Sequence, residues 1–463
     1  MSNMNKDFVI YDSMLRQKKQ FKPLQPGKIS LYVCGMTVYD YCHIGHARVI
    51  IFFDFAARFL KALNYDVKYV RNITDIDDKI IKKSISEGVS CDEITAKFIA
   101  AMHEDAANLG ANSPDFEPKA TSYVENMIVM ITTLIQNGLA YVSDSGDVCY
   151  AVTKFADYGK LARRDLSKLR AGERIAADKS KNDPLDFVLW KLAKPDEPSW
   201  GSPWGRGRPG WHIECSVMAS TLLGKTIDIH GGGVDLQFPH HENEIAQSEG
   251  ANKQKFVGSW MHVGALQINS EKMSKSLGNF FTIREVLAEF NYETIRYFMF
   301  STHYRHPIQY TIENLQQAGR SLERMYIALR HAGCDIKPVF TGPEYNGFID
   351  ALRDDFNTPK ALAVMAEQVK KINIEAAGSE DAVRLGAGLL AMGAILGLFA
   401  AGVAGYFNLD DAGSVEIEAL VKAREAARHE KDWPRADEIR DQLLNEYNVE
   451  VEDAAEGSIW RRF

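Results

Sequence analysis

The hydrophobic pattern in the first part of the chain alternates between short apolar runs and longer stretches with helical spacing. Residues 29–33 (Ile-Ser-Leu-Tyr-Val) are apolar and rich in β-formers, as expected of a buried strand, and residues 67–72 form a second such run. Between them, residues 46–63 carry apolar side chains at helical spacing without a breaker. The pattern predicts a right-handed β-α-β unit, which is typical of one half of a nucleotide-binding doubly wound sheet.

The next part of the chain is predicted to be mostly helical over residues 77–138 and then to form a β-hairpin around the turn-rich residues 144–147. Residues 154–204 are first basic and then rich in Pro, Gly and Trp, which indicates an insertion. The sheet is predicted to resume with a helix at 211–223, a strand at 226–230, a loop that opens with three glycines at 231–233, a helix from 240 and a strand near 260–266.

Beyond Thr282 the spacing predicts helices to about Ala401, then a Gly/Ala linker at 401–405 and a small unit of charged helices and short strands. We therefore expect an α/β protein with a Rossmann-type, doubly wound parallel sheet split by an insertion, followed by an α-helical bundle and a small mixed α/β C-terminal domain. The expected boundaries are 1–120 and 209–310 for the two halves of the sheet, 121–208 for the insertion, 311–401 for the bundle and 402–463 for the last domain.

Composition narrows the class of protein. A hydrophobic fraction of 46% with 25% charged residues is ordinary for a soluble protein, and no apolar run approaches the roughly 20 residues of a membrane span. The N-terminal residues lack the apolar core of a signal peptide, so we expect a cytoplasmic protein without a membrane partner. We also expect a monomer. The six scattered cysteines then favour free thiols or metal ligands over disulfides. A net charge of -8 means that any nucleic acid must be held by local basic patches.

Two short motifs point to nucleotide chemistry. His43 and His46 stand where the first strand gives way to the first helix, and Gly45 between them allows close backbone approach, so both imidazoles can donate hydrogen bonds to phosphate. Far along the chain, Lys272 and Lys275 supply ammonium groups for the β- and γ-phosphates. Each motif alone is common by chance, but together they predict a nucleotidyl-transfer site.

A second group of residues could bind a metal. His240 and Glu244 stand four apart at the start of a predicted helix, so they share one face. Cys215, on the preceding helix, and Cys34, at the end of the first strand, are natural partners, and two thiolates with an imidazole and a carboxylate suit zinc rather than magnesium or calcium. Buried core cysteines and surface His-x-x-x-Glu pairs are also common, and the pattern alone leaves this alternative open.

The motifs His43-Ile-Gly-His46 and Lys272-Met-Ser-Lys-Ser276 resemble the HIGH and KMSKS motifs of class I aminoacyl-tRNA synthetases. The whole chain is similar to the cysteinyl-tRNA synthetase family. The similarity is carried by residues 32–48, 72–79, 210–216, 230–244, 272–279, 354–359 and 460–462.

The resemblance implies a ligase that activates L-cysteine with ATP and transfers it to the 3′-terminal adenosine of tRNA(Cys). It also implies one Zn2+ per chain, bound to the substrate thiol, and Mg2+ with the ATP, for which no residue can be assigned. The implied residues are Cys34, Cys215, His240 and Glu244 for zinc; Gly35, Thr37, Thr74, Trp211 and His230 for cysteine; His43, Gly45, His46, Asp235 and Lys275 for ATP; and His43, His46, Lys272 and Lys275 for catalysis.

Two alternatives are a related ligase and a protein from another class of function. A ligase that joins cysteine to an amino-sugar in thiol biosynthesis would share the catalytic half and the zinc set, but its family lacks the RNA-binding tail, which is present here up to Arg462. A non-catalytic zinc protein that only binds RNA would be expected to lose the nucleotide motifs, whereas His43, His46 and Lys275 are all in place. Both comparisons favour the tRNA ligase.

Overall fold

The computed structural model describes residues 8–164, 180–268, 271–272, 280–407, 414–447, 449–454 and 457–462. The chain forms two compact units. The first comprises Met1–Arg320, Asn346–Val364 and Ile395–Gly397, and the second comprises Ser321–Tyr345, Met365–Ala394 and Leu398–Phe463. Among the helices in the described ranges, none is both long and apolar enough to cross a membrane.

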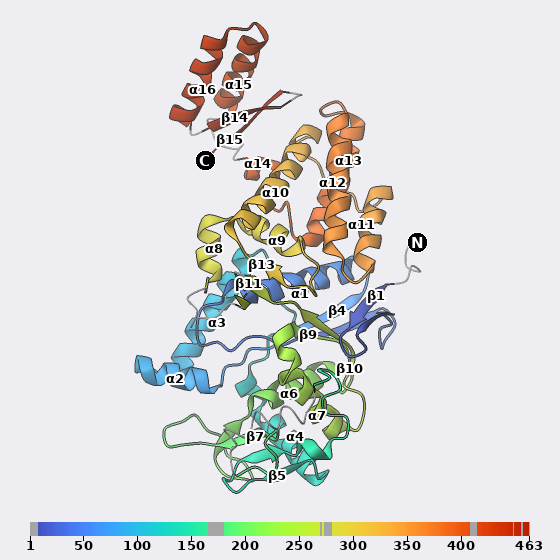
Figure 1. The fold of residues 1–463 in the computed structure, drawn as a ribbon, viewed down its shortest axis with the longest axis vertical. Helices are drawn as coiled ribbons and strands as arrows, with labels where there is room; N and C mark the ends of the chain where they lie inside the picture. The colour runs from blue at the N-terminus through green and yellow to red at the C-terminus, as the bar shows by residue number, and fades with distance from the viewer. Residues whose placement is uncertain are drawn as a thin grey trace. The chain divides into compact units, whose positions relative to one another are not determined.

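The first unit is built around a four-stranded parallel sheet with the order β10-β9-β3-β4 (Figure 1). Its strands are β3 (Lys28–Val33), β4 (Asp66–Arg71), β9 (Ile227–Gly233) and β10 (Val257–Val263). The chain passes from β3 to β4 on one side and later returns to β9 on the other. This order confirms the predicted doubly wound parallel sheet, and it places the switch point, where such sheets bind ligands, between β3 and β9.

Helix α1 (Ile44–Ala62) connects β3 to β4 and begins within two residues of the predicted start. Strand β9 corrects one expectation, because Gly231, Gly232 and Gly233 belong to the strand and do not open a loop. The reason is close packing: a Cβ on Gly231 would lie 2.1 Å from the ring of Phe53 on α1. Only a residue without a side chain lets the buried strand and the helix approach so closely.

The predicted hairpin is confirmed, but it is one half of a larger, antiparallel sheet with the order β5-β6-β7-β8. These strands are β5 (Ala140–Val142), β6 (Val148–Tyr150), β7 (Phe187–Leu192) and β8 (Gly207–Pro209). Helices α4 (Val124–Gln136), α6 (Trp211–Leu223) and α7 (His240–Asn252) pack against one another, and α4 also contacts β5 (Figure 1). The inserted segment therefore has a sheet of its own beside the helices that follow it in sequence.

The first unit contains further short strands and helices outside the two four-stranded sheets. They are β1 (Val9–Asp12), β2 (Gln17–Gln20), α2 (Asp78–Glu87), α3 (Cys91–Asn108), η1 (Ala120–Tyr123), η2 (Val152–Lys154), η3 (Val234–Gln237), β11 (Leu266–Ile268), β12 (Glu271–Lys272), α8 (Ile283–Glu289), α9 (Tyr292–Phe300) and β13 (Ile308–Gln309). The predicted break at Gly88 is confirmed, since this residue caps α2 in a left-handed conformation with φ of 68°.

The C-terminal part confirms the predicted helical run. Its helices are α10 (Ile312–Ala332), α11 (Pro343–Arg353), α12 (Thr358–Ile374), α13 (Glu380–Leu396), α14 (Gly402–Tyr406), α15 (Ser414–His429) and α16 (Trp433–Tyr447), with a hairpin of β14 (Val449–Ala454) and β15 (Gly457–Arg462). The expected linker at 401–405 overlaps the short helix α14, and Tyr406 at the end of this helix stacks on Tyr326 with ring centroids 3.7 Å apart. Trp460 lies in a small core of its own with Ile417 and Leu443.

Candidate active site and metal centre

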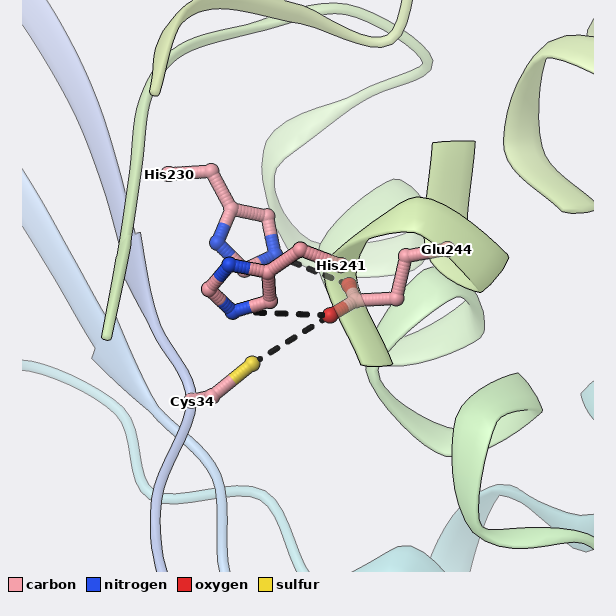
Figure 2. Close-up of side chains that lie close together, drawn as sticks. All are labelled: Cys34, His230, His241 and Glu244. Carbon is pink, nitrogen blue, oxygen red and sulfur yellow. Dashed lines mark hydrogen bonds and ion pairs between the residues drawn. The ribbon is translucent and has the colours of Figure 1, made fainter. Parts of the chain in front are cut away.

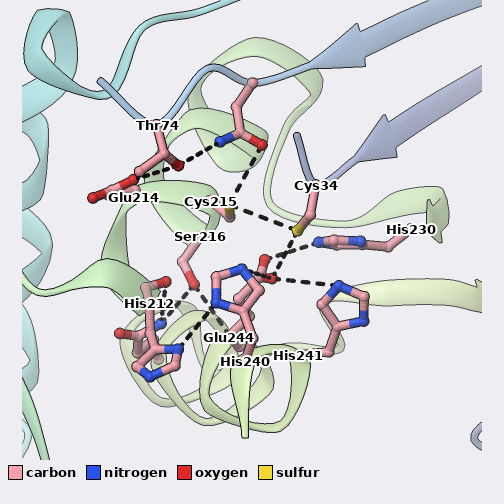
Figure 3. A network of polar contacts seen from close by, with 12 residues as sticks. Cys34, Thr74, His212, Glu214, Cys215, Ser216, His230, His240, His241 and Glu244 are labelled. Carbon is pink, nitrogen blue, oxygen red and sulfur yellow. Dashed lines mark hydrogen bonds and ion pairs between the residues drawn. The ribbon is translucent and has the colours of Figure 1, made fainter. Parts of the chain in front are cut away.

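The four predicted zinc ligands come together at the switch point of the parallel sheet. Cys34 follows β3, and its backbone N–H donates to the carbonyl of Gly231 on β9 at 3.0 Å. Cys215 lies in α6, while His240 and Glu244 lie on one face of the first turns of α7 (Figure 3). All four side chains are buried.

The distances between the donor atoms fit a zinc ion. The sulfurs of Cys34 and Cys215 are 3.7 Å apart, Cys34 Sγ is 3.3 Å from Glu244 Oε1, and His240 Nε2 is 3.1 Å from the same oxygen. Ligands held at about 2.0 to 2.3 Å around a tetrahedral zinc ion lie about 3.3 to 3.8 Å from one another. Two of the three distances lie in this range and the third is about 0.2 Å shorter, so these four side chains could hold a metal ion.

A second set of four buried side chains shares two of these residues. Cys34 and Glu244 also face His230 and His241, as Figure 2 shows. His230 Nε2 lies 2.8 Å from Glu244 Oε2, and His241 Nε2 lies 3.9 Å from Glu244 Oε1. This set offers one thiol instead of two. His241 was not predicted from the sequence, although the pair His240-His241 was a visible signal, and His230, expected to contact cysteine, lies against Glu244.

In the first set, burial and the neighbouring groups shift the pKa of Cys34 upward and those of Cys215 and Glu244 downward. Burial raises the pKa of the Cys34 thiol well above its ordinary value, and the neighbouring Cys215 adds to this. Burial also acts to raise the pKa of Cys215, but the hydrogen bond from the Cys34 thiol and the charge of His240 outweigh it and lower this pKa to about 6. For Glu244 burial is outweighed by His230 and His240, so the pKa falls well below its ordinary value. A bound cation would compensate this buried negative charge.

Three residues predicted to contact cysteine lie side by side next to this cluster. Thr37 and Thr74 form an isolated parallel bridge, and the backbone N–H of Val38 donates to the Thr74 carbonyl at 3.2 Å. The N–H of Gly35 donates to Asn72 Oδ1 at 2.8 Å, which leaves the Asn72 amide nitrogen to donate to Thr74 Oγ1 at 3.3 Å. The ends of β3 and β4 are thus fastened together at the predicted amino-acid pocket.

Asn72 and Glu214 are site residues that were not predicted. Glu214 on α6 is fully buried, and Thr74 Oγ1 donates to its Oε2 at 3.0 Å (Figure 3). Its signal in the sequence was a carboxylate between Ile213 and Cys215 in the predicted helix. Trp211, also predicted to contact cysteine, is 40% exposed, and its indole stacks on the imidazole of His240 with centroids 4.6 Å apart.

The two histidines of the predicted nucleotide site cap helix α1. The N–H of His46 donates to Nδ1 of His43 at 3.3 Å, and the N–H of His43 donates to Nδ1 of His46 at 3.2 Å, so the pair forms a reciprocal capping box. The rings stack with centroids 3.5 Å apart, and Gly45 lies between them in the first turn. Each ring therefore accepts a hydrogen bond at Nδ1, and a neutral ring carries its proton at Nε2.

Segments distant in sequence meet at this helix start. The N–H of Ile44 donates to the carbonyl of Phe281 at 3.0 Å, and the N–H of Ile283 donates to the carbonyl of Cys42 at 2.9 Å. Residues 281–283, a few positions beyond the lysine motif in sequence, are thereby attached to the histidine motif. Asp235 is exposed in η3, just after β9. Lys272 ends β12, and Lys275 lies outside the described residues.

Comparisons with known proteins agree with this architecture. Residues 20–320 match the model of the class I (C) tRNA synthetase catalytic domain, residues 347–400 match the DALR domain, and residues 410–461 match the cysteinyl-tRNA ligase anticodon binding domain. Among solved structures, the methionyl-tRNA synthetase of Mycobacterium tuberculosis in complex with methionyl-adenylate is similar, with a TM-score of 0.58 and 15% identity over 80% of this chain and 89% of that chain. The LeuRS-tRNA-LeuAMS ternary complex of Agrobacterium radiobacter K84 gives a TM-score of 0.56 and 12% identity over 81% and 84%.

The fold and the catalytic-domain match define a class I aminoacyl-tRNA synthetase, which is a ligase. Curated relatives identify the family within this class. The chain is 52% identical to the cysteine–tRNA ligase of Methylococcus capsulatus over 98% of its own length and 99% of that protein, and 51% identical to that of Idiomarina loihiensis over the same shares. The chain belongs to the cysteine–tRNA ligase family.

Proposed function

We propose that this chain activates L-cysteine with ATP and transfers the cysteinyl group to the 3′-terminal adenosine of tRNA(Cys), and that Cys34, Cys215, His240 and Glu244 hold one zinc ion that selects the substrate thiol. The observation that supports this most directly is the buried cluster of two thiols, an imidazole and a carboxylate with zinc-like spacing at the switch point of the sheet.

Selection by a metal answers a specific physical problem. Cysteine differs from serine by one atom, and a pocket that senses shape alone separates such pairs by only about 1 to 3 kcal/mol. A bound zinc ion supplies a Lewis acid that prefers a thiolate to a neutral hydroxyl. The residues around it must then place the amino acid, and Gly35, Thr37, Thr74 and Trp211 are our candidates. His230 orients Glu244 through its 2.8 Å hydrogen bond.

The set with two cysteines is favoured over the set with His230 and His241. Thiolates are common donors in zinc sites and suit zinc as a soft ligand, and only the first set contains the sulfurs of both Cys34 and Cys215. In the second set, Nε2 of His241 lies 3.9 Å from Glu244 Oε1, which is longer than the three donor distances given for the first set. We therefore assign the ion to Cys34, Cys215, His240 and Glu244.

Activation joins the cysteine carboxylate to the α-phosphorus of ATP and breaks the bond to the leaving pyrophosphate. His43 and His46 hold their protons at Nε2, since both Nδ1 atoms accept backbone hydrogen bonds, and these Nε2–H groups donate to phosphate oxygens as charge builds up. Gly45 allows the backbone to approach the nucleotide, and Asp235 binds the ribose. The ammonium groups of Lys272 and Lys275 hold the pyrophosphate, and Mg2+ accompanies the ATP. The terminal ribose hydroxyl of the tRNA then attacks the cysteinyl carbonyl and releases AMP.

The tRNA, rather than an amino-sugar, is the proposed acceptor. The helices α15 and α16 and the β14-β15 hairpin form a small folded module with its own core, and the matching family model for this segment is an anticodon binding domain. A ligase that joins cysteine to a small amino-sugar has no use for such a module. We place the anticodon contacts in residues 402–463, and we expect the protein to act in the cytoplasm.

The test is cysteine-dependent exchange of pyrophosphate into ATP, with zinc quantified on the same samples. We expect exchange with cysteine and none above background with serine. Cys215→Ala should lose the zinc and at least about 100-fold in exchange rate, while Cys149→Ala, which removes a buried cysteine on β6 outside the cluster, should keep both. Robust exchange with serine, or full activity after complete removal of the metal, would contradict the proposal.

A further inference from the structure

The imidazole of the proposed zinc ligand His240 is held on two sides. Its Nε2 points to Glu244 Oε1 at 3.1 Å, toward the metal donors, and its Nδ1 lies 3.0 Å from Nδ1 of His212 on α6 (Figure 3). The indole of Trp211 stacks on the face of the same ring, with an interplanar angle of 26°. Consecutive residues of α6 thus fix both the plane and the edge of this imidazole.

The direction of the bond between the two histidines follows from the chemistry of a ligand imidazole. A ring that gives the lone pair of Nε2 to a metal carries its proton on Nδ1, so His240 must be the donor of this hydrogen bond. His212 must then accept at its own Nδ1 and carry its proton on Nε2. If His212 instead carried its proton on Nδ1, this proton would face the Nδ1 proton of His240 and no hydrogen bond could form. If His240 then moved its own proton to Nε2 to accept the bond, its Nε2 would have no lone pair left for the metal.

His212 itself is fixed by neighbours that the metal does not involve. Its backbone carbonyl accepts from Gln247 Nε2 at 2.8 Å, and the same amide nitrogen lies 2.9 Å from Ser216 Oγ. The ring of Phe187, on β7 of the inserted sheet, packs edge-on against the His212 imidazole with centroids 5.6 Å apart. These contacts hold His212 in the position where its Nδ1 can accept the hydrogen bond from His240.

We propose that His212 is a positioning residue for zinc: it accepts the Nδ1–H of His240 and so fixes the tautomer and the orientation in which His240 binds the ion. This inference rests on the proposed metal assignment. A partner of this kind is worth about 10- to 100-fold in metal affinity.

The chain offers a matched control in the histidine beside the ligand. His241 Nδ1 lies 2.9 Å from Nε2 of His262, whose Nδ1 lies 2.7 Å from Ser13 Oγ. His262 thus holds His241 as His212 holds His240. If His240 is the ligand, removing the His212 acceptor weakens zinc binding and removing that of His262 does not; if His241 were the ligand, the order would be reversed.

The experiment measures the zinc affinity of the full-length protein by competition with a chromophoric chelator, together with the absorption spectrum of the Co2+-substituted protein and the melting temperature. His212→Phe keeps a flat ring but has no acceptor, and we expect it to bind zinc 10- to 100-fold more weakly and to change the Co2+ spectrum. His212→Asn can place its side-chain oxygen where Nδ1 lay, and it should restore the affinity to within about threefold of the wild type, as should the control His262→Phe.

The outcomes separate this inference from the proposed function. An unchanged zinc affinity and Co2+ spectrum in His212→Phe would overturn the positioning role, and so would an equal loss in His212→Asn, because ring packing and not the acceptor would then be responsible. A loss confined to His262→Phe would move the metal to the set with His241. If the wild-type protein binds no zinc, the metal assignment itself fails, whatever the His212 variants do.

Discussion

Gly35 follows the proposed zinc ligand Cys34, and its Cα lies close to the backbone of Asn72 at the end of β4. A Cβ built on Gly35 would lie 1.7 Å from the backbone oxygen of Asn72 and 2.9 Å from its carbonyl carbon. Because both atoms belong to the main chain, no rotation of a side chain can relieve the contact. We therefore predict that Gly35→Ala forces apart the two segments that form the amino-acid pocket.

The size of the effect follows from these distances. A Cβ does not approach such an oxygen closer than about 3.0 Å, so the segments must separate by about 1.3 Å. Zinc ligands keep their distances within about 0.2 Å, and Cys34 is the covalent neighbour of the displaced residue. A misplacement near 1 Å costs on the order of 100-fold in rate, or about 2.7 kcal/mol in transition-state stabilisation. The strain itself should cost about 1 to 3 kcal/mol of folding free energy.

The assay is cysteine-dependent pyrophosphate exchange, with zinc content and thermal unfolding measured on the same samples. Gly35→Ala should lose zinc and about 100-fold or more in exchange rate. Gly201→Ala is the control, because Gly201 has open space around its Cα and no left-handed backbone angle. If Gly35→Ala keeps its zinc and exchanges within about threefold of the wild type, the close approach of β3 and β4 does not set the geometry of the site.

Two further predictions concern other parts of the chain. Removal of residues 408–463, which contain the matched anticodon module, should leave cysteine-dependent exchange within about threefold but reduce tRNA charging at least tenfold, and equal charging by the shortened chain would refute the assignment of that module. Burial lowers the pKa of His303 from 6.5 to about 4 despite the nearby Asp355. Because the unfolded chain binds this proton at higher pH than the folded chain does, stability should fall as the pH drops from 6.5 to 4, by at most about 3 kcal/mol. The free energy of unfolding, measured with urea between pH 6.5 and 4, should fall less steeply with pH for His303→Phe than for the wild type. The same pH dependence in both proteins would refute the reasoning.

The local elements were predictable because their signals are local. Helix α6 runs from Trp211 to Leu223 as expected, since Gly210 and Gly224 flank an uninterrupted helical pattern. The inserted sheet was only half predicted, because β7 and β8 join the hairpin from more than thirty residues further along, and no local period reports such a pairing. The glycines of β9 were misassigned for a similar reason: their absent side chains make room for Phe53, which lies far away in sequence.

The site was predictable to the extent that its residues carry recognisable chemistry. The four proposed zinc ligands were named from their types and from the resemblance, and the structure brings all four together. Asn72, Glu214 and His212 were not, because their roles consist of hydrogen bonds to other site residues, and an amide, a carboxylate or an imidazole in a sequence does not reveal its partner. The residues that bind could be predicted, whereas those that orient the binders needed the structure.

One loop carries both halves of the proposed chemistry. Cys34 begins it at the metal donors, and His43 ends it at the start of α1, with the bridge between Thr37 and Thr74 in the middle. The middle of the loop is hydrogen-bonded to the segment that follows β4. The positions of Cys34 at one end of the loop and His43 at the other are therefore both fixed relative to this segment. In the proposed mechanism, an amino acid bound through its sulfur is thereby placed relative to His43 and His46, which we propose act on the phosphates. The preference for a thiol would then contribute to the rate of activation as well as to binding. Discrimination between cysteine and serine would in that case appear in kcat/KM and would not require an editing step.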